Sequence, residues 1–204
     1  MSVAIIDYRA GNLTSVQRAL AHLGVAGEVT ADPARIATAD RVIFPGVGAA
    51  GSCMSNLVDT GMADALREAV ASGRPVLGIC VGMQLLFERS EEDGGVACTG
   101  LLPGEVQRFR PADRSLKVPH MGWNPVSFAD GEPLAQGIPA GSAFYFVHSY
   151  FCAPADEAQV IARSDHGESF CAGVRRDNLV AVQFHPEKSG PVGLQLLRNF
   201  LEVA

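Results

Sequence analysis

The stretch VLGICVGMQ, Val76 to Gln84, decides the fold of this chain, because it leads a short apolar run straight into a cysteine that stands between two glycines. The run up to Cys80 predicts a buried strand, and a helix is expected from Val81. G-x-nucleophile-x-G between a strand and a helix is the nucleophile-elbow pattern, in which small neighbours permit a strained, accessible turn. Cys80 is therefore a candidate nucleophile, although a free cysteine is more commonly a small buried hydrophobe.

Two groups near Cys80 could stabilise an oxyanion. The helix expected from Val81 would place its partial positive charge at the sulfur, which favours the thiolate, and would aim the N–H of Val81 at the developing charge. The glycine-rich turn PGVG follows an apolar run at Arg41 to Phe44. It lacks the lysine and the spacing of a phosphate-binding loop, so the backbone N–H groups around Val47 and Gly48 fit better as a second oxyanion donor.

A candidate base follows the apolar run Leu179 to Phe184. His185 and Glu187 are two residues apart, so on an extended chain their side chains leave on the same side, and Pro186 stiffens the link. A histidine ring oriented by a carboxylate is the base that a cysteine nucleophile needs. A lone HPE is more often a strand end, but here it and the cysteine elbow both close an expected sheet strand, where open α/β sheets bind their ligands.

The composition bounds the fold class and the partners. A chain of 204 residues fits one α/β domain over 1–204, and the net charge of −6 without a basic run argues against nucleic acid and against an anionic membrane surface. No apolar stretch reaches the ~18 residues of a membrane span and no signal peptide is evident, so the cytoplasm is the expected compartment. The five cysteines show no C-x-x-C, which predicts neither disulfides nor a metal site.

Short apolar runs alternate with amphipathic stretches in the first half of the chain. Ser2 to Asp7 and the runs ending at Phe44 and Cys80 are expected strands, while Leu13 to Leu23 and Gly61 to Ser72 are expected helices. Strands that alternate with helices predict right-handed β-α-β units and a parallel sheet with helices on both faces.

The second half changes character after about Glu88. Strand-like runs follow one another closely, and the last segment, Gly190 to Val203, is an expected helix. The runs are EVQRF, AFYFVHSYFC, AQVIAR, SFCAGVRR and LVAVQF. The fold class is therefore α/β: a single domain with a mixed, mostly parallel, flavodoxin-like central sheet flanked by helices, and antiparallel strands in the C-terminal half.

With the elbow and HPE in place, the chain resembles the class I glutamine amidotransferases, and within that class the glutaminase subunits of imidazole glycerol phosphate synthase. The resemblance extends from about Ile5 to Asn199. Arg9 stands where glycine is commoner in that family, and Ala50 where an aromatic residue is commoner. The segments that carry the resemblance are IDYRAGNLTSV, PGVGAAGSCM, GICVGMQLLFE, VPHMGWN, YFVHSY and FHPEKSG.

The resemblance implies hydrolysis of glutamine through a thioester. The ammonia would pass to a separate (β/α)8-barrel cyclase subunit, in a heterodimer that makes imidazole glycerol phosphate and an aminoimidazole carboxamide ribonucleotide (AICAR) for histidine biosynthesis. No cofactor is implied. The family's site residues match the following positions: triad Cys80, His185 and Glu187; oxyanion turn Val47 and Gly48; glutamine site Gln84, His148, Ser149 and Tyr150; barrel side Asn12, Trp123 and Lys188.

Other interpretations remain open from the residues alone. A stand-alone cysteine amidohydrolase or peptidase, or a non-catalytic partner-binding subunit, could use the same fold. As sequence features, His120 and His148 are more typical of structural histidines. Trp123 fits a core position or a turn that presents an aromatic side chain to a partner. We also expect the oxyanion turn to be unproductive at rest, since the glycines around Val47 would allow a peptide flip.

Overall fold

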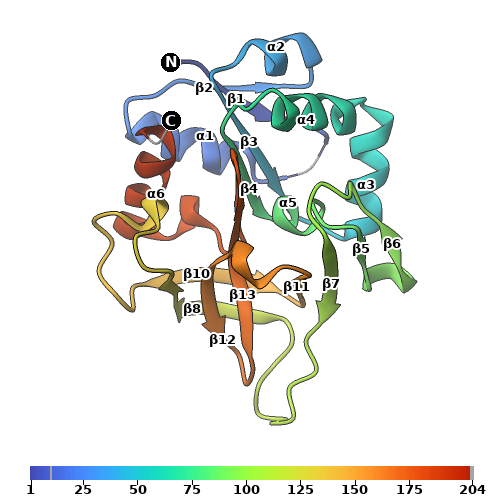
Figure 1. The fold of residues 1–204 in the computed structure, drawn as a ribbon, viewed down its shortest axis with the longest axis vertical. Helices are drawn as coiled ribbons and strands as arrows, with labels where there is room; N and C mark the ends of the chain where they lie inside the picture. Colours follow the sequence, from blue (N-terminus) through green and yellow to red (C-terminus); the bar gives the residue numbers. More distant parts are fainter. Residues whose placement is uncertain (10, 203–204) are drawn as a thin grey trace.

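A mixed β-sheet divides the molecule into two helical layers. The computed structural model describes residues 1–9 and 11–202. In Figure 1 helices α1 (Leu13–His22) and α6 (Gly190–Glu202) lie on one side of the central strands, and α3 (Ala50–Asp59) and α4 (Met62–Ala71) lie on the other. This arrangement confirms the expected α/β fold with helices on both faces.

Five parallel strands form the first part of the sheet, in the order β2-β1-β3-β4-β14. Strands β1, β3, β4 and β14 are buried along their whole length, as continuous apolar runs are when both faces of a sheet are covered. Their bounds are β1 Val3–Ile6, β2 Gly27–Thr30, β3 Arg41–Gly46, β4 Val76–Cys80 and β14 Leu179–Val182; two further helices are α2 Pro33–Thr38 and α5 Val81–Gln84.

Strand β13 turns the sheet antiparallel, because it pairs with β14 through a tight hairpin and then with β11 and β12. The expected hairpins of the C-terminal half are thus present. The remaining strands are β5 Arg89–Ser90, β6 Val96–Ala97, β7 Gly104–Arg108, β8 His120–Pro125, β9 Ser127–Phe128, β10 Ala143–His148, β11 Tyr150–Pro154, β12 Val160–Asp165 and β13 Ser169–Arg176.

Two expectations for this half are wrong in detail. The run AFYFVHSYFC is not one strand: it breaks at Ser149, after which β11 joins the large sheet while β10 pairs only with β8 in a separate two-stranded ribbon.

Trp123 lies within strand β8 and not in a turn. Gly122, with φ +133, supplies the unusual backbone there, so a glycine read as a turn signal belongs to an irregular strand.

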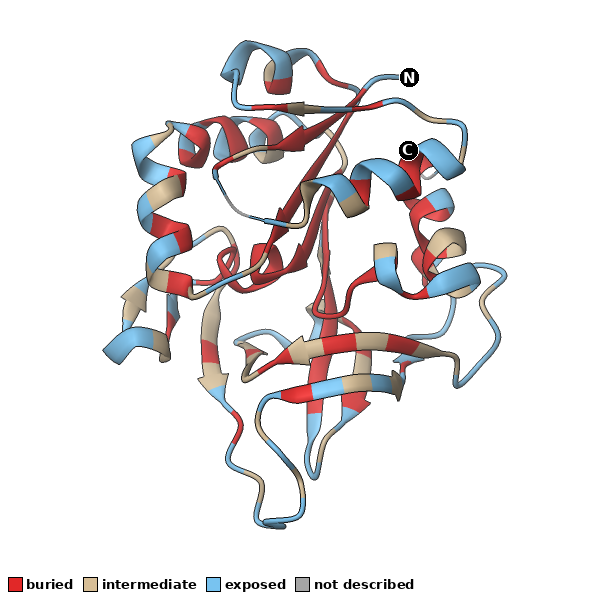
Figure 2. Ribbon diagram, turned by 180° about the vertical axis from the view of Figure 1, so that it is seen from behind, coloured by how far each residue is buried: buried red, intermediate tan, exposed pale blue. Residues whose placement is uncertain are grey.

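One continuous hydrophobic core joins both parts of the sheet to the helices. Figure 2 shows it as buried central strands with exposed colour on the outer faces of the helices. The expected last helix is present as α6, which packs inward through Leu196 and Phe200, whereas Val203, the expected end of this helix, lies outside the described residues. Within residues 1–9 and 11–202, no helix has the length and apolar character to cross a bilayer.

Candidate active site

Cys80 lies at a sharp turn between strand β4 and helix α5. Its backbone has φ 56 and ψ −114, and its side chain is 3% exposed. Positive φ is strained for a residue with a Cβ, and such strain clusters at functional sites. The strand, turn and helix that the elbow pattern predicts are therefore all present around Cys80.

The glycines on either side allow close packing at this turn. A Cβ on Gly82 would lie 2.0 Å from the carbonyl oxygen of Phe44, on the neighbouring strand β3. A Cβ on Gly78 would lie 2.9 Å from the Cβ of Ala181, on strand β14. Both contacts are shorter than real side chains tolerate, so only glycine lets α5 and the two strands approach around Cys80.

His185 and Glu187 are joined by a hydrogen bond of 2.8 Å between Nδ1 and Oε1, and both side chains are fully buried. The two side chains meet for a reason other than the expected extended backbone. The chain does not stay extended but turns at His185 into a short 3-10 helix, η4 (Pro186–Lys188), which brings the carboxylate back to the ring. Asn12 donates its side-chain amide to the same carboxylate oxygen. The backbone N–H of His185 donates to the carbonyl of Tyr145 at 2.9 Å.

The ring of His185 is held as an imidazolium. Burial by itself would lower its pKa, but attraction to Cys80 and to Glu187 outweighs burial and raises the pKa to about 10. With Nδ1 bound to Glu187, the Nε2 atom has no hydrogen-bond partner among the described residues. His185 and Cys80 line the same cavity, so this buried N–H is available to a group that binds beside the sulfur.

The thiols of the other four cysteines are held in their protonated form. Burial raises the pKa of each thiol, to about 11 for Cys98 and about 12 for Cys171. The pKa values of Cys53 and Cys152 are raised for the same reason. A raised pKa keeps a thiol protonated and poorly nucleophilic, so none of these four thiols is suited to act as the nucleophile.

A cavity of about 280 Å³ brings most of the expected residues together. It has the size of a site for a small molecule. A larger hollow of about 560 Å³ lies along residues 126–141 and contains none of the expected residues, so volume alone does not identify the site. The smaller cavity is lined by Val47, Gly48, Cys80, Val81, Gln84, Glu92, Pro119, Val147, His148, Ser149, Tyr150 and His185.

Two of its polar side chains are already engaged within the chain. The amide nitrogen of Gln84 donates to the carbonyl of Tyr150 at 2.9 Å and to Oε1 of Gln183 at 3.0 Å. Both ring nitrogens of His148 have partners, His120 and the carbonyl of Tyr150. Gln84 can therefore still offer its oxygen to a ligand, whereas His148 contributes a wall of the cavity.

The turn at Val47 and Gly48 lies beside the candidate nucleophile, because Gly46 at the end of β3 is in register with Cys80. Gly48 has φ +114, a backbone conformation that favours glycine. The carbonyl of Val47 accepts a hydrogen bond from the thiol of Cys53 at 3.5 Å. The orientation of the peptide between Val47 and Gly48 is thus held by a contact from helix α3.

Two polar residues of the site were not anticipated. Glu92 lines the cavity and also accepts the N–H of Ala50, at the start of helix α3, at 2.8 Å. Gln183 is fully buried, joins Gln84, and lies 3.9 Å from the sulfur of Cys80 through its amide nitrogen. A polar residue at the end of the apolar run before HPE is a signal that could have identified Gln183.

The residues expected on the partner side fall into two groups. Trp123 is 58% exposed, and Met121 on the same strand is 63% exposed. Lys188 is also exposed. Asn12, in contrast, is half-buried and bound to Glu187, so its amide belongs to the hydrogen-bond network of the candidate base.

The sequence of the chain matches a known protein family whose members share this fold. Residues 4–204 match the family described as glutamine amidotransferase class-I. The chain belongs to the class I glutamine amidotransferase family.

Similar proteins narrow this further. The chain is 53% identical to the imidazole glycerol phosphate synthase subunit HisH of Methylococcus capsulatus, over 98% of this chain and 95% of that protein. It is 53% identical to the subunit of the same name from Moorella thermoacetica, over 98% and 94%. A crystal structure of a glutamine amidotransferase has a TM-score of 0.76 at 20% identity, covering 99% of this chain and 98% of that one. A glutamine amidotransferase from Thermotoga maritima has a TM-score of 0.73 at 16% identity, over 99% and 96%. The last two share the fold.

The raised pKa of His185 links protonation to stability. The pKa in the folded chain, about 10, lies above the ordinary value of 6.5. The imidazolium therefore stabilises the fold fully below about pH 6.5, and this contribution is lost as the pH rises through about 10.

In Glu187→Gln, we expect the pKa of His185 to fall from about 10 toward its ordinary range, because one of its two partners loses its charge. Nitrogen NMR of the histidine rings across neutral to alkaline pH measures this change. The control is Glu168→Gln, at an exposed position outside the cavity, which should leave the titration unchanged. A His185 that titrates near its ordinary value in the unsubstituted chain would contradict this account.

Proposed function

We propose that this chain hydrolyses glutamine to glutamate and ammonia as the glutaminase subunit of an imidazole glycerol phosphate synthase. The observation that carries the proposal is that Cys80, on a strained elbow, and His185, oriented by Glu187, line one cavity of substrate size. The relatives named HisH support the same activity and its place in histidine biosynthesis.

The thiolate of Cys80 attacks the side-chain carbonyl carbon of glutamine. The oxyanion that forms is stabilised by the N–H of Val81 and by the turn at Val47 and Gly48, which line the cavity beside the sulfur. As the C–N bond breaks, the imidazolium of His185 gives its Nε2 proton to the nitrogen, and ammonia leaves. A γ-glutamyl thioester remains on Cys80.

The second half-reaction reverses the direction of proton transfer. His185, now neutral, takes a proton from a water molecule that attacks the thioester carbonyl. The C–S bond breaks, glutamate leaves, and the thiolate and imidazolium are restored. Throughout the reaction Nδ1 of His185 stays hydrogen-bonded to Glu187, whose carboxylate is held by Asn12. The proton is therefore transferred through Nε2 of His185.

The groups that hold glutamine follow from the polar lining of the cavity. Glu92 is the acidic side chain of that lining, so it suits the α-ammonium group. Burial raises the pKa of Glu92, and a bound ammonium would offset the cost of its charge. The free oxygen of Gln84 and the backbone of Ser149 and Tyr150 supply further polar contacts, and His148 closes the wall.

The ammonia passes to a partner cyclase subunit, a (β/α)8 barrel by family resemblance. The exposed side chains of Met121 and Trp123 give that partner an apolar surface, and the exposed Lys188, three residues after His185, adds a positive charge for it. The aromatic ring of Trp123 makes an edge contact with Tyr145, whose carbonyl holds the backbone of His185. Tyr145 alone therefore lies between a partner bound at Trp123 and the candidate base His185.

Cys80→Ala should abolish glutamate formation while the chain remains folded. No other cysteine can replace Cys80, because the other four thiols are held protonated. The assay measures glutamate release with and without the cyclase subunit and its nucleotide ligand, and we expect strong stimulation in the unsubstituted complex. The matched control is Cys98→Ala, a half-buried thiol outside the cavity, which should retain full activity. Persistent glutaminase activity in Cys80→Ala would exclude the mechanism.

Glu92→Gln should raise the KM for glutamine by a factor of about ten or more, since a hydrogen bond between charged groups is worth about 1.5–3 kcal/mol. The amide oxygen still caps helix α3, so kcat should change little. Asp93→Asn is the matched control: Asp93 accepts the N–H of Gly51 at the same helix end but does not line the cavity. Equal effects of both variants on KM would assign Glu92 a structural role only.

A further inference from the structure

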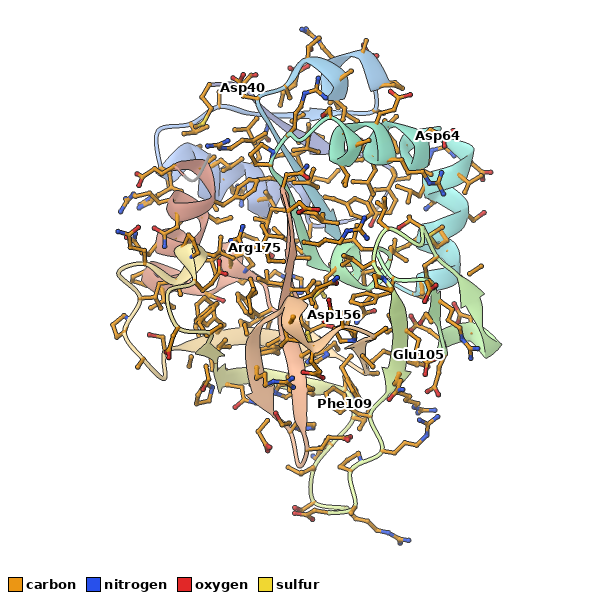
Figure 3. All side chains as sticks on the ribbon, viewed as in Figure 1. Asp40, Asp64, Glu105, Phe109, Asp156 and Arg175 are labelled. Atoms are coloured by element: carbon orange, nitrogen blue, oxygen red, sulfur yellow. The ribbon has the colours of Figure 1, made fainter. Side chains whose placement is uncertain are left out.

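A cluster of aromatic rings lies behind the glutamine cavity and takes no part in the proposed chemistry. His120, His148 and His166 pack around Phe109, which Figure 3 labels near the end of β7. His120 stacks on His166 with ring centres 4.2 Å apart. His120 and His148 are each only 6% exposed, so every polar atom of these rings needs a partner.

The partners form one chain of hydrogen bonds from strand β8 to the cavity wall. The side-chain nitrogen of Asn124 lies 3.2 Å from Nε2 of His120. Nδ1 of His120 lies 2.9 Å from Nε2 of His148. Nδ1 of His148 lies 2.8 Å from the carbonyl oxygen of Tyr150, which also accepts from Gln84.

Carbonyl oxygens at the two ends fix the direction of every bond. Because the oxygen of Tyr150 can only accept, Nδ1 of His148 carries a proton and its Nε2 accepts from His120. Nε2 of His120 must then accept from Asn124, whose amide nitrogen also donates to the carbonyl of Asp165 at 2.6 Å. Burial lowers the pKa of His120 to about 4 and that of His148 to about 3, so both rings are neutral, as this direction requires.

The two ends of the chain lie at functionally distinct places. At the inner end, Tyr150 and Gln84 line the cavity proposed for glutamine. At the outer end, Asn124 follows Trp123 on strand β8, whose exposed residues form the proposed partner surface. His120 and His148 are also directly opposite each other in the β8–β10 ribbon. The pairing of these two strands therefore helps to hold the two rings at hydrogen-bond distance.

We propose that Asn124, His120 and His148 form a directional hydrogen-bond chain that holds Tyr150 and Gln84 in place for glutamine, which makes His120 a positioning residue for substrate binding. The proposal rests on the proposed function. His120 does not line the cavity, so it acts through His148. Loss of the chain weakens binding of glutamine and leaves the chemical step at Cys80 nearly unchanged.

Two substitutions at His120 separate hydrogen bonding from packing. His120→Phe keeps a buried ring against Phe109 and Phe146 but removes both nitrogens. His120→Asn loses the ring, yet its amide nitrogen takes the place of Nδ1 and can still donate to His148. If His120 acts only through packing, the variant with the lower thermal stability should also bind the glutamine analogue more weakly. If it acts through the hydrogen-bond chain, the less stable His120→Asn should bind the analogue better than His120→Phe.

The assay is covalent labelling of Cys80 by a diazoketone analogue of glutamine, in the complex of the full chain with the cyclase subunit and its nucleotide ligand. We expect His120→Phe to raise the half-saturating analogue concentration by a factor of about ten, with a limiting rate within about twofold of the unsubstituted chain. His120→Asn should remain within about threefold in half-saturating concentration despite a lower midpoint in thermal unfolding. Val58→Asp, at an apolar position of helix α3 that is 61% exposed, is the control and should match the unsubstituted chain.

Ring-nitrogen NMR supplies a readout that packing does not change. In the unsubstituted chain, His120 and His148 should both carry their proton on Nδ1. A proton on Nε2 of either ring, or a half-saturating concentration in His120→Phe equal to that of the unsubstituted chain, would overturn the proposal. So would weaker binding in His120→Asn than in His120→Phe. Absence of labelling in the unsubstituted complex would instead contradict the proposed function.

Discussion

The close approach of helix α5 to strands β3 and β14 is the constraint on which the rest of the site depends. Gly82 lies against the backbone of Phe44, and Gly78 against Ala181, so neither position has room for a side chain on either side of the turn that holds Cys80. Cys80 is thereby held at a positive φ, at the end of a fully buried strand. Dense packing on both sides offsets the strain of the turn, which an isolated peptide would relax.

The same geometry determines which other groups can contribute to catalysis. Strand β14 runs parallel to β4, so the segment that follows β14 delivers His185 to the edge of the sheet where Cys80 emerges. The opposite neighbour, β3, delivers the turn at Val47 and Gly48. The proposed nucleophile, base and oxyanion turn thus come from three adjacent strands, so the distances between them are set mainly by strand register and less by flexible loops.

Much of the fold and the triad could be predicted because they depend on local patterns: apolar runs, an elbow with two glycines, and a histidine two residues before a glutamate. Contacts between distant segments were harder. Nothing near Glu92 in the sequence indicates that a charged loop reaches the cavity, and Asn12 gains its contact with Glu187 only through the fold. The break at Ser149, between two strands in different sheets, has no glycine or proline to mark it.

The central claim is that glutamine is hydrolysed through a thioester on Cys80. Rapid-quench mass spectrometry of the complete synthase, mixed with glutamine in the presence of the cyclase ligand, tests it most directly. The account predicts a γ-glutamyl adduct on the peptide that contains Cys80, formed before glutamate appears and lost as glutamate is released. Glutamate formation without any adduct on that peptide, or an adduct on one of the other four cysteines, would contradict it.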